Sequence, residues 1–325
     1  MNIAILGAGA WGSALAISLS QAHEVALWAR AVQDCEALGR SRTSRYLPRC
    51  PIPPSVRIEP SLENAARAEL VVVATATAGL RPVCEALARS APAPRLLWAC
   101  KGFESDSREL PHEIVAQALP RAQHVGALSG PSFALEVARG QPTALVLASH
   151  DARFARATAV ALNSPRLRVY SSADLRGVEL GGAVKNVIAI AAGISDGLEL
   201  GRNARAALVT RGLAEIVRLG VALGGQVETF MGLAGLGDLV LTCTGELSRN
   251  REVGMRLAQG RTLEQALAEL GHVAEGVHSA RAVRELARAH GVEMPITDAV
   301  CAVIFEGLGP RAAVERLLTR DPRPE

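Results

Sequence analysis

The two lysines are the residues of this sequence that are most suited to acid–base chemistry. Lys101 and Lys185 are the only lysines among 35 lysine and arginine residues. An arginine stays protonated in proteins, whereas a lysine can lose its proton where the surroundings disfavour the charge. Lys185 lies in a largely apolar segment, residues 181–190, and is a candidate acid or base. On rarity alone, a lysine whose stem packs on small residues while its head reaches water explains the pattern equally well.

A glycine-rich turn follows the first apolar run of the chain. Gly7, Gly9 and Gly12 stand between the apolar residues 1–6 and a helix-forming segment at 13–19, with Ala10 and Trp11 inside the turn. In this context the glycines allow a tight turn and a close approach of the backbone to a pyrophosphate, which binds at the helix N-terminus. The turn therefore predicts a dinucleotide site.

The second expected strand, residues 24–28, is followed by an arginine where NAD-binding folds usually carry an acid. A carboxylate at that position binds the ribose hydroxyls of NAD. Here the position holds Arg30, and Arg42 and Arg45 follow in the next loop. Because arginines suit the 2′-phosphate of NADP, the sequence favours NADP over NAD. The alternative is that these arginines form a solvated surface.

Two loops are expected at the carboxyl ends of buried strands, where α/β sheets bind their ligands. Lys101 follows the strand at residues 95–99, and the segment 129–134 follows the strand at 124–128. In that segment Gly130 allows close backbone approach, and Ser132 adds a hydroxyl beside free amide groups. The pattern suits an anion, although an ordinary strand-to-helix turn would explain this segment when it is taken alone.

Short apolar runs alternate with helical patterns in the first half of the chain, and helical patterns fill the second half. The alternation predicts an α/β fold with an N-terminal doubly wound Rossmann-type domain, which binds the dinucleotide (residues 1–173). An all-helical C-terminal domain follows, with the substrate and catalytic residues (174–325). Strands are expected at residues 1–6, 24–28, 56–58, 70–74, 95–99, 124–128, 143–148 and 166–170. Between the strands, helices are expected at 62–68, 80–89 and 110–118. Later helices are expected at 179–194, 203–223, 262–270, 281–290 and 298–305, the last capped by Thr297.

Two stretches interrupt the helical half. Residues 231–238 form a glycine-rich, mostly apolar segment that is expected to be a loop and ends in a carboxylate, Asp238. Further on, Ser248 is placed to cap a helix whose first turn holds Arg249 and Asn250. The positive end of a helix dipole disfavours cations unless an anion binds there, so this helix start predicts a phosphate site. The alternative is an exposed helix start with idle surface charges.

Composition excludes several other classes of protein. The net charge is +3, and the scattered cations do not indicate a nucleic-acid partner. The six cysteines lack metal-ligand spacing, so we expect no metal and reduced, buried thiols. No apolar run approaches the roughly 20 residues that a membrane-spanning helix needs, and the apolar start lacks a positively charged leader. We therefore expect a cytoplasmic protein without membrane insertion.

A series of motifs follows in order along the chain. They are GAGAWG (7–12), ACKG (99–102), SGPSFA (129–134), GGAVKNVIAI (181–190), NARAALVTRGLAE (203–215), GLGDLVLTC (235–243) and SRNR (248–251). Through these motifs the chain resembles the bacterial-type NAD(P)-dependent sn-glycerol-3-phosphate dehydrogenases over essentially its whole length. The resemblance implies an oxidoreductase that interconverts glycerol 3-phosphate and dihydroxyacetone phosphate, supplies phospholipid synthesis and is compatible with a homodimer.

The resemblance also implies roles for individual residues. Lys185 would accept the proton of the C2 hydroxyl as hydride leaves for the cofactor. The small phosphorylated substrate would contact Lys101, Gly130, Ser132, Lys185, Asp238, Ser248, Arg249 and Asn250. Besides the glycines, the cofactor would contact Ala10, Trp11, Arg30, Lys101, Ala134, Arg249, Val273 and Glu275. The sequence departs from the family at residues 75–78, where Thr-Ala-Thr-Ala replaces the usual Pro-Ser pair, and at Arg30.

Two other functions remain open from the residues themselves. A related two-domain dehydrogenase for a hydroxy acid or phosphogluconate would share the architecture but would be expected to carry a carboxylate-binding set in place of SRNR. A non-catalytic NADPH-binding regulator would explain the glycine turn. It would leave Lys185, Asp238 and the SRNR segment without a purpose.

Overall fold

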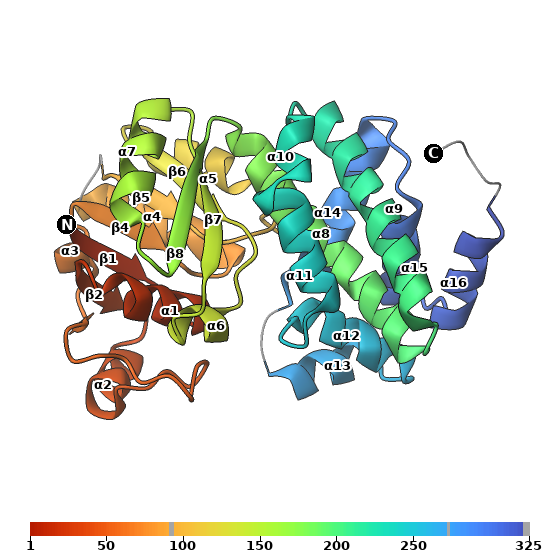
Figure 1. Ribbon diagram of the computed structural model, residues 1–325, viewed down its shortest axis with the longest axis horizontal. Helices are drawn as coiled ribbons and strands as arrows, with labels where there is room; N and C mark the ends of the chain where they lie inside the picture. The colour runs from red at the N-terminus through yellow and green to blue at the C-terminus, as the bar shows by residue number, and fades with distance from the viewer. Residues whose placement is uncertain (91–93, 272–273, 321–325) are drawn as a thin grey trace. The chain divides into compact units, whose positions relative to one another are not determined.

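The chain forms two compact units in the computed structural model, which describes residues 1–90, 94–271 and 274–320 (Figure 1). Unit 1 comprises Met1–Glu104 and Glu109–Glu179, and unit 2 comprises Ser105–Arg108 and Leu180–Glu325. A Rossmann-type α/β region followed by a helical region confirms the expected fold class. The domain boundary expected after residue 173 lies just before helix α8 (Leu175–Gly197), and the compact units divide within the first turns of that helix.

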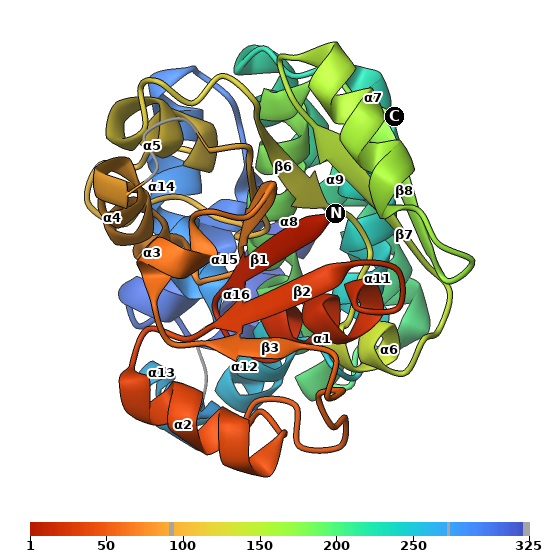
Figure 2. The same cartoon turned by 90° about the vertical axis from the view of Figure 1, so that its left-hand side faces the viewer.

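Unit 1 is built on one eight-stranded sheet. The strand order is β3-β2-β1-β4-β5-β6-β7-β8, and its first six strands have the order of a Rossmann fold. All neighbours pair in parallel except β6 and β7; Figure 2 shows β1, β2 and β3 side by side. The strands are β1 (Asn2–Leu6), β2 (Glu24–Trp28), β3 (Arg57–Glu59), β4 (Leu70–Val73), β5 (Leu96–Trp98), β6 (Val125–Ser129), β7 (Thr143–Ala148) and β8 (Leu167–Ser172).

Burial explains why these strands could be predicted. Every residue of β4 is buried, as a parallel strand covered on both faces requires, so its sequence is a continuous apolar run. Two helices that the sequence analysis did not predict, α2 and α7, complete the unit. Its helical elements are α1 (Ala10–Leu19), α2 (Val32–Ser41), α3 (Leu62–Ala65), the 3-10 turn η1 (Thr77–Gly79), α4 (Leu80–Ser90), α5 (Pro111–Ala118), α6 (Ala134–Ala138) and α7 (Ala152–Leu162).

The sheet brings four loops to one edge. Strands β1, β4, β5 and β6 are parallel neighbours, so their carboxyl ends meet at the same edge. Gly7, Thr75, Lys101 and Gly130 each follow one of these strands. The dinucleotide turn and both expected ligand loops of unit 1 therefore lie along one edge of the sheet.

Unit 2 contains helices and turns but no strand among its described residues, and α8 lies at its centre (Figure 1). Small residues let other backbones reach this helix. A Cβ added to Gly193 of α8 would meet the carbonyl oxygen of Arg251 at 1.9 Å, and one on Gly254 would meet that of Ile190 at 2.0 Å. The other helical elements are α9 (Gly201–Ala222), α10 (Val227–Met231), the π-helical turn η2 (Leu233–Gly237), α11 (Asp238–Thr244), α12 (Arg249–Ala258), α13 (Leu263–Leu270), α14 (Glu275–Ala289), α15 (Pro295–Phe305) and α16 (Pro310–Leu318).

Two local predictions for unit 2 are wrong. The glycine-rich segment before Asp238 is a π-helical turn and not a loop, because its glycines serve packing: a Cβ on Gly235 would meet the carbonyl oxygen of Phe230 at 2.0 Å. Thr297 does not cap a helix. It lies inside α15, which begins at Pro295, and its amide and hydroxyl donate to the buried carboxylate of Glu215.

Two further observations concern the whole chain. All six cysteines are buried, as expected, and none of them forms a disulfide. Among the described residues, α8 is the one helix long and apolar enough to cross a membrane, but its apolar window is entirely buried inside the fold, as in the core helix of a globular domain.

Candidate active site

The glycine turn of unit 1 has a different steric role at each glycine. Gly7 has a φ of +124°, and a Cβ there would meet the carbonyl oxygen of Ala74 at 2.8 Å. A Cβ on Gly12 would meet the carbonyl oxygen of Gly7 at 1.8 Å, so Gly12 lets α1 pack against the turn. A Cβ on Gly9 would have no atom within 4 Å. Gly9 therefore leaves open space where a pyrophosphate would approach the backbone.

The start of α1 fits such an anion. Gly9 is the N-cap residue and provides no side-chain cap, so the first amide groups of the helix, at Ala10, Trp11 and Gly12, are oriented toward this space. The neighbouring Thr75 hydroxyl is buried and has no hydrogen-bond partner among the described residues. The turn thus offers donors and one orphaned hydroxyl, and the residues present fit a dinucleotide.

The three arginines expected near the ribose differ in exposure and in hydrogen-bond partners. Arg30 follows β2 and is exposed. Arg42 does not fit the expected role, because its guanidinium donates to backbone carbonyls, including those of Ile52 at 3.3 Å and Val56 at 2.7 Å. Arg45 lies over the ring of Tyr46, with 4.7 Å between the guanidinium carbon and the ring centroid, and donates to its hydroxyl. Of the three, Arg30 is the best placed for a 2′-phosphate.

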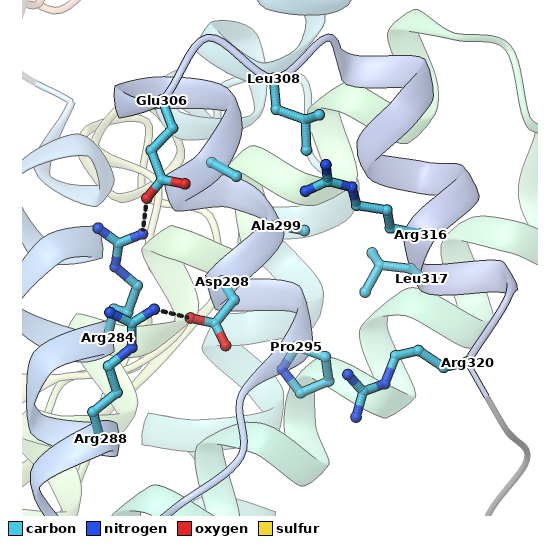
Figure 3. A pocket seen from close by; sticks show the side chains of 11 residues that line it. Arg284, Arg288, Pro295, Asp298, Ala299, Glu306, Leu308, Arg316, Leu317 and Arg320 are labelled. Carbon is cyan, nitrogen blue, oxygen red and sulfur yellow. Dashed lines mark hydrogen bonds and ion pairs between the residues drawn. The ribbon is translucent and has the colours of Figure 1, made fainter.

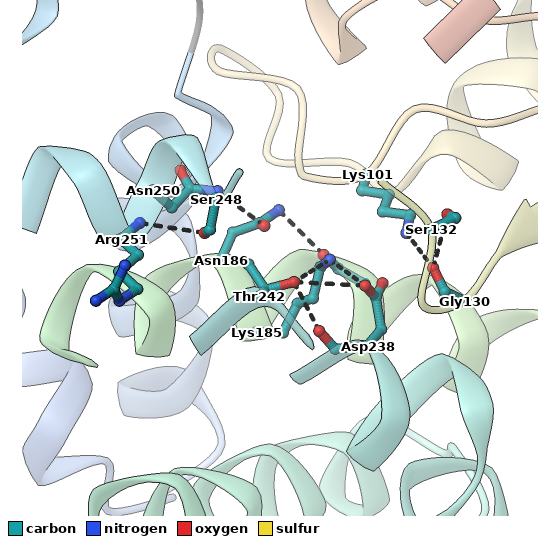
Figure 4. Close-up of polar contacts among 11 residues, drawn as sticks. Lys101, Gly130, Ser132, Lys185, Asn186, Asp238, Thr242, Ser248, Asn250 and Arg251 are labelled. Carbon is teal, nitrogen blue, oxygen red and sulfur yellow. Dashed lines mark hydrogen bonds and ion pairs between the residues drawn. The ribbon is translucent and has the colours of Figure 1, made fainter. Parts of the chain in front are cut away.

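Lys101 and the loop after β6 meet at one carbonyl group. Lys101 Nζ donates to Gly130 O at 3.1 Å, and Ser132 Oγ donates to the same oxygen at 3.0 Å (Figure 4). Gly130 has a φ of +131°, and a Cβ there would meet Ala144 O at 3.1 Å, so this loop needs glycine. Ala134 begins α6, which packs against α1. The structure therefore brings Lys101, Gly130 and Ser132 together at the sheet edge that carries the glycine turn.

Lys185 is buried in unit 2 and bonded to two partners on α11. Its Nζ donates to Asp238 Oδ1 and, at 2.8 Å, to Thr242 Oγ1 (Figure 4). The side chains of Lys185 and Asp238 are 7% and 2% exposed. A buried ammonium needs such a partner, since an unpaired buried charge is very unfavourable. Lys185 is therefore held in one position by a carboxylate and a hydroxyl.

The local sequence explains why α8 and α11 meet at this lysine. Gly181 lies one turn before Lys185, and a Cβ there would meet Ala234 O of η2 at 2.6 Å. The π-helical turn passes close to α8 at this glycine and ends at Asp238, the first residue of α11. The backbone is helical without a break from the π-helical turn into α11, and the amide of Asp238 donates to Gly235 O and Leu233 O, so this helical segment holds Asp238 beside α8.

Asn186, whose role the sequence did not explain, begins a chain of amide hydrogen bonds. Its Nδ2 donates to Gly182 O at 3.1 Å, and its Oδ1 accepts from Asn250 Nδ2 at 2.9 Å. Asn250 Oδ1 in turn accepts from the backbone N–H of Gly276 at 3.0 Å. These bonds join α8, α12 and the start of α14. Asn250 thus has an evident structural role beside the substrate contact that the resemblance implies.

The start of α12 is capped as predicted, and only one of its arginines is left for a ligand. Ser248 Oγ accepts from the backbone N–H of Arg251 at 3.3 Å, and Arg251 Nε is committed to Asp196 at 2.6 Å. The guanidinium of Arg249 has no hydrogen bond in the described part of the chain. The side chain of Arg249 is exposed, but nearby protein atoms still lower its pKa by desolvation, and the charge of Glu275 opposes that shift. Arg249 is therefore the residue of this segment that an anion would stabilise most.

Some functional candidates were missed and one cannot be placed. Thr242 was not singled out, although its position four residues after Asp238 on a helix puts both on one face. Glu275 begins α14. Val273 lies outside the described residues. Among the described residues, no group of three or more His, Cys, Asp or Glu could hold a metal ion.

An arginine-rich pocket elsewhere in unit 2 contains none of the predicted site residues (Figure 3). Its volume is about 250 Å³, and it is lined mainly by α14, α15 and α16. Two of its arginines are already neutralised, because Arg284 pairs with Glu306 and Arg288 with Asp298. The pocket therefore does not compete with Lys185 and Arg249 as the candidate site.

Comparison with known proteins gives a consistent result for both halves. Residues 2–155 match the family described as NAD-dependent glycerol-3-phosphate dehydrogenase N-terminus, and residues 174–315 match its C-terminus. The chain is similar to proteins named glycerol-3-phosphate dehydrogenase (NAD(P)+) from Thiobacillus denitrificans, 56% identical with both chains fully covered, and from Dechloromonas aromatica, 57% identical over 100% of this chain and 99% of the relative. It also matches the crystal structure of glycerol-3-phosphate dehydrogenase from Coxiella burnetii, with a TM-score of 0.93, 42% identity and coverage of 98% and 99% of the two chains.

Proposed function

Because this chain belongs to the NAD-dependent glycerol-3-phosphate dehydrogenase family, we propose that it is an oxidoreductase that interconverts sn-glycerol 3-phosphate and dihydroxyacetone phosphate with NAD(P). The observation that carries the proposal is the buried Lys185 ammonium, which Asp238 and Thr242 hold in place. When bound, the nicotinamide supplies or accepts the hydride. The protein supplies the proton and the position of the substrate.

The proton transfer follows from the chemistry of Lys185. In oxidation, the neutral amine accepts the proton of the C2 hydroxyl while C2 loses a hydride, and the carbonyl of dihydroxyacetone phosphate forms. In reduction, C2 gains the hydride and the Lys185 ammonium gives its proton to the developing alkoxide. Asp238 favours the charged ammonium by direct pairing, which suits reduction. Thr242 accepts one N–H of the ammonium and restricts its orientation.

The remaining residues are proposed to contact either the substrate or the cofactor. Arg249 suits the phosphate of the substrate, since its guanidinium has no hydrogen bond among the described residues and Arg251 is already ion-paired. The other substrate contacts proposed are Lys101, Gly130, Ser132, Asp238, Ser248 and Asn250. The proposed cofactor contacts are Gly7, Gly9, Ala10, Trp11, Gly12, Arg30, Lys101, Ala134, Arg249, Val273 and Glu275.

The wider assignments rest on these sites. We propose residues 1–173 as the dinucleotide-binding domain and residues 174–325 as the substrate and catalytic domain. NADP is the favoured cofactor, because Arg30 is exposed after β2 where an NAD site usually carries an acid. A role in phospholipid synthesis, a cytoplasmic location and a homodimer are proposed from the resemblance and the composition.

One assay tests this function against its alternatives. We expect the protein to oxidise NADPH when it is mixed with dihydroxyacetone phosphate, with the reaction followed by NADPH absorbance. A matched reaction with an unphosphorylated 2-keto acid should be far slower, because Arg249 then has no phosphate to bind. Faster turnover of the keto acid would favour a hydroxy-acid dehydrogenase. NADPH binding without turnover of either compound would favour a regulator.

A further inference from the structure

A buried carboxylate that the proposed mechanism does not use lies in unit 1. Glu179 Oε1 accepts hydrogen bonds from Trp98 Nε1 at 2.7 Å and from the backbone N–H of His112 at 2.9 Å, and Glu179 Oε2 contacts His112 Nδ1. The side chains of Glu179 and His112 are 2% and 13% exposed. Burying a carboxylate is costly unless it is paired and hydrogen-bonded, and here both oxygens are satisfied.

The partners of Glu179 all come from other elements of unit 1. Trp98 is the last residue of β5, and His112 is in the first turn of α5. Glu179 itself is in α8 and is the last residue that belongs to unit 1. The three hydrogen bonds therefore join the start of α8 to a strand and a helix of unit 1.

The carboxylate of Glu179 lies on the same helix as Lys185. From Glu179 the helix continues without interruption to Gly197 and carries Lys185 two turns later. Trp98 ends β5, and Lys101 lies in the short loop that follows this strand. The bond from Trp98 to Glu179 thus connects the strand that leads to one lysine with the helix that leads to the other.

We propose that Glu179 is a positioning residue, which anchors the first turns of α8 on Trp98 and His112 and so fixes the helix that presents Lys185 to the substrate. The proposal rests on the proposed function, because it assumes that Lys185 transfers the proton. A misplacement of about 1 Å at a reacting group can cost about a hundredfold in rate. Loss of the anchor should therefore lower turnover more than cofactor binding, which depends on the glycine turn of unit 1.

The anchor also has a predicted pH dependence. Burial disfavours the charged imidazole of His112, but the hydrogen bond and charge of Glu179 outweigh this effect and raise the pKa of His112. Glu113 on the same helix raises it further, Arg176 of α8 lowers it, and the ring of His150 lies 6.2 Å away. Burial also raises the pKa of Glu179, against the contacts with His112 and Trp98 that lower it. Because the folded pKa of His112 exceeds the unfolded value of 6.5, the contribution of His112 to stability is present below pH 6.5 and is lost as pH rises through the raised pKa.

Three substitutions separate anchoring from general stability. Glu179→Ala removes all three bonds, and we expect kcat to fall about 10- to 100-fold, with the Kd for NADPH unchanged. Glu179→Gln should restore most of the turnover, because its carbonyl can accept from Trp98 and the His112 amide while its NH₂ group donates to neutral His112. The ratio of kcat in Glu179→Gln to kcat in wild type should rise with pH. The reason is that the ion pair between Glu179 and His112 exists only in wild type and is lost as His112 loses its proton. Trp98→Phe removes a single donor and should lower kcat in the same direction by less.

Glu215→Ala is the matched control. Glu215 is also a buried carboxylate that accepts two backbone N–H groups and a side-chain donor, but it holds the start of α15 and not that of α8. It should lower the melting temperature and leave kcat at the wild-type value. The proposal would be overturned if Glu215→Ala and Glu179→Ala lowered the melting temperature equally and also lowered kcat equally. It would also be overturned if Glu179→Ala kept the wild-type kcat but bound NADPH more weakly.

Hydrogen exchange of the α8 backbone tests the anchor without measuring the reaction. Hydrogen exchange over residues 175–185 should be faster in Glu179→Ala than in wild type, with exchange in α15 unchanged, and Glu179→Gln should restore slow exchange. Unchanged exchange in α8 would overturn the anchor. If wild type failed to reduce dihydroxyacetone phosphate, the proposed function would fail, while the exchange data would still decide whether Glu179 holds α8. Trp98→Phe provides the same readout if Glu179→Ala does not fold.

Discussion

The dinucleotide site proposed in unit 1 and the catalytic site proposed in unit 2 are built from different kinds of group. In unit 1 the glycine turn is made of backbone, namely three glycines and the amide groups at the start of α1. In unit 2 the candidate catalytic site is made of buried side chains, in which Lys185, Asp238 and Thr242 bond to one another. We propose that the first arrangement binds the pyrophosphate that every dinucleotide carries, and that the second donates or accepts one proton.

This difference predicts different responses to substitution. A site made of backbone amides tolerates many side chains but not a Cβ in the path of the ligand or of packing. A site made of buried charged side chains depends on single atoms, because each group has been taken out of water and relies on its partners. Substitutions in unit 2 should therefore act on chemistry or stability, and those in the glycine turn on cofactor affinity.

The largest expected effect belongs to Lys185→Arg. Arginine keeps the positive charge for Asp238 but does not exchange its proton in the working pH range, so we expect turnover to fall by about 10²- to 10⁴-fold. Cofactor binding should stay normal, because the substitution leaves the glycine turn intact. Stopped-flow measurement of NADPH oxidation, with NADPH binding by fluorescence as the control, tests this. Wild-type turnover in Lys185→Arg would exclude this lysine as the proton donor and acceptor.

The second effect concerns stability and pH in unit 2. Burial raises the pKa of Glu215 to about 7, against the hydrogen bonds from Ile296 and Thr297 that lower it. The folded state therefore holds this proton more tightly than the unfolded chain, whose value is 4.5. The stabilisation is complete below about pH 4.5 and declines as pH rises to about 7, by roughly 3 kcal/mol at most.

Glu215→Gln provides the measurement for this prediction. The variant cannot titrate at this position, so the difference in unfolding free energy between wild type and variant should shrink steadily as the pH rises from about 5 to about 7. Urea unfolding at several pH values gives this difference. A constant difference over that range would mean that Glu215 has the same pKa in the folded and unfolded states.

A smaller effect is expected from Arg249→Ala. Hydrogen bonds to charged groups contribute about 1.5–3 kcal/mol, so the KM for dihydroxyacetone phosphate should rise about 10- to 100-fold with a smaller change in kcat. Arg251→Ala is the control on the same helix. Because Arg251 is bonded to Asp196, its loss should lower the melting temperature and leave KM near the wild-type value. A normal KM in Arg249→Ala would place the substrate phosphate elsewhere.

The sequence predicted those parts of the fold and site whose signals are local. The eight strands were found because buried parallel strands are short apolar runs between helices, and the glycine turn because its spacing is diagnostic beside a strand. Ser248 was identified as a cap because it accepts from a residue only three positions away. Lys185 became the candidate base from its rarity and from its neighbours in the motif.

The features that were missed depend on residues far apart in the chain. Thr242 contacts Lys185 across 57 positions, and Asn186 meets Asn250 across 64, so neither pairing has a local pattern. The cap assigned to Thr297 is wrong because its amide is satisfied by Glu215, 82 positions earlier. The glycines before Asp238 suggested a loop, although they are present to let backbones pack closely. In each case tertiary contact decides between two meanings of the same residue type.

The smallest expected effect tests the backbone end of the comparison. Gly9 has open space around an added Cβ, so Gly9→Ala should fold normally, while its methyl group should hold the pyrophosphate away from the first amides of α1 and raise the Kd for NADPH about tenfold. Gly39 in α2 is the matched control, because an added Cβ there also meets nothing within 4 Å. Gly39→Ala should leave NADPH binding unchanged and raise stability by up to about 1 kcal/mol through helix propensity. If fluorescence titration gave the same Kd for both variants and wild type, the space beside Gly9 would not be the pyrophosphate site. The comparison would then be wrong in its first part, because the backbone of the glycine turn would not bind the cofactor.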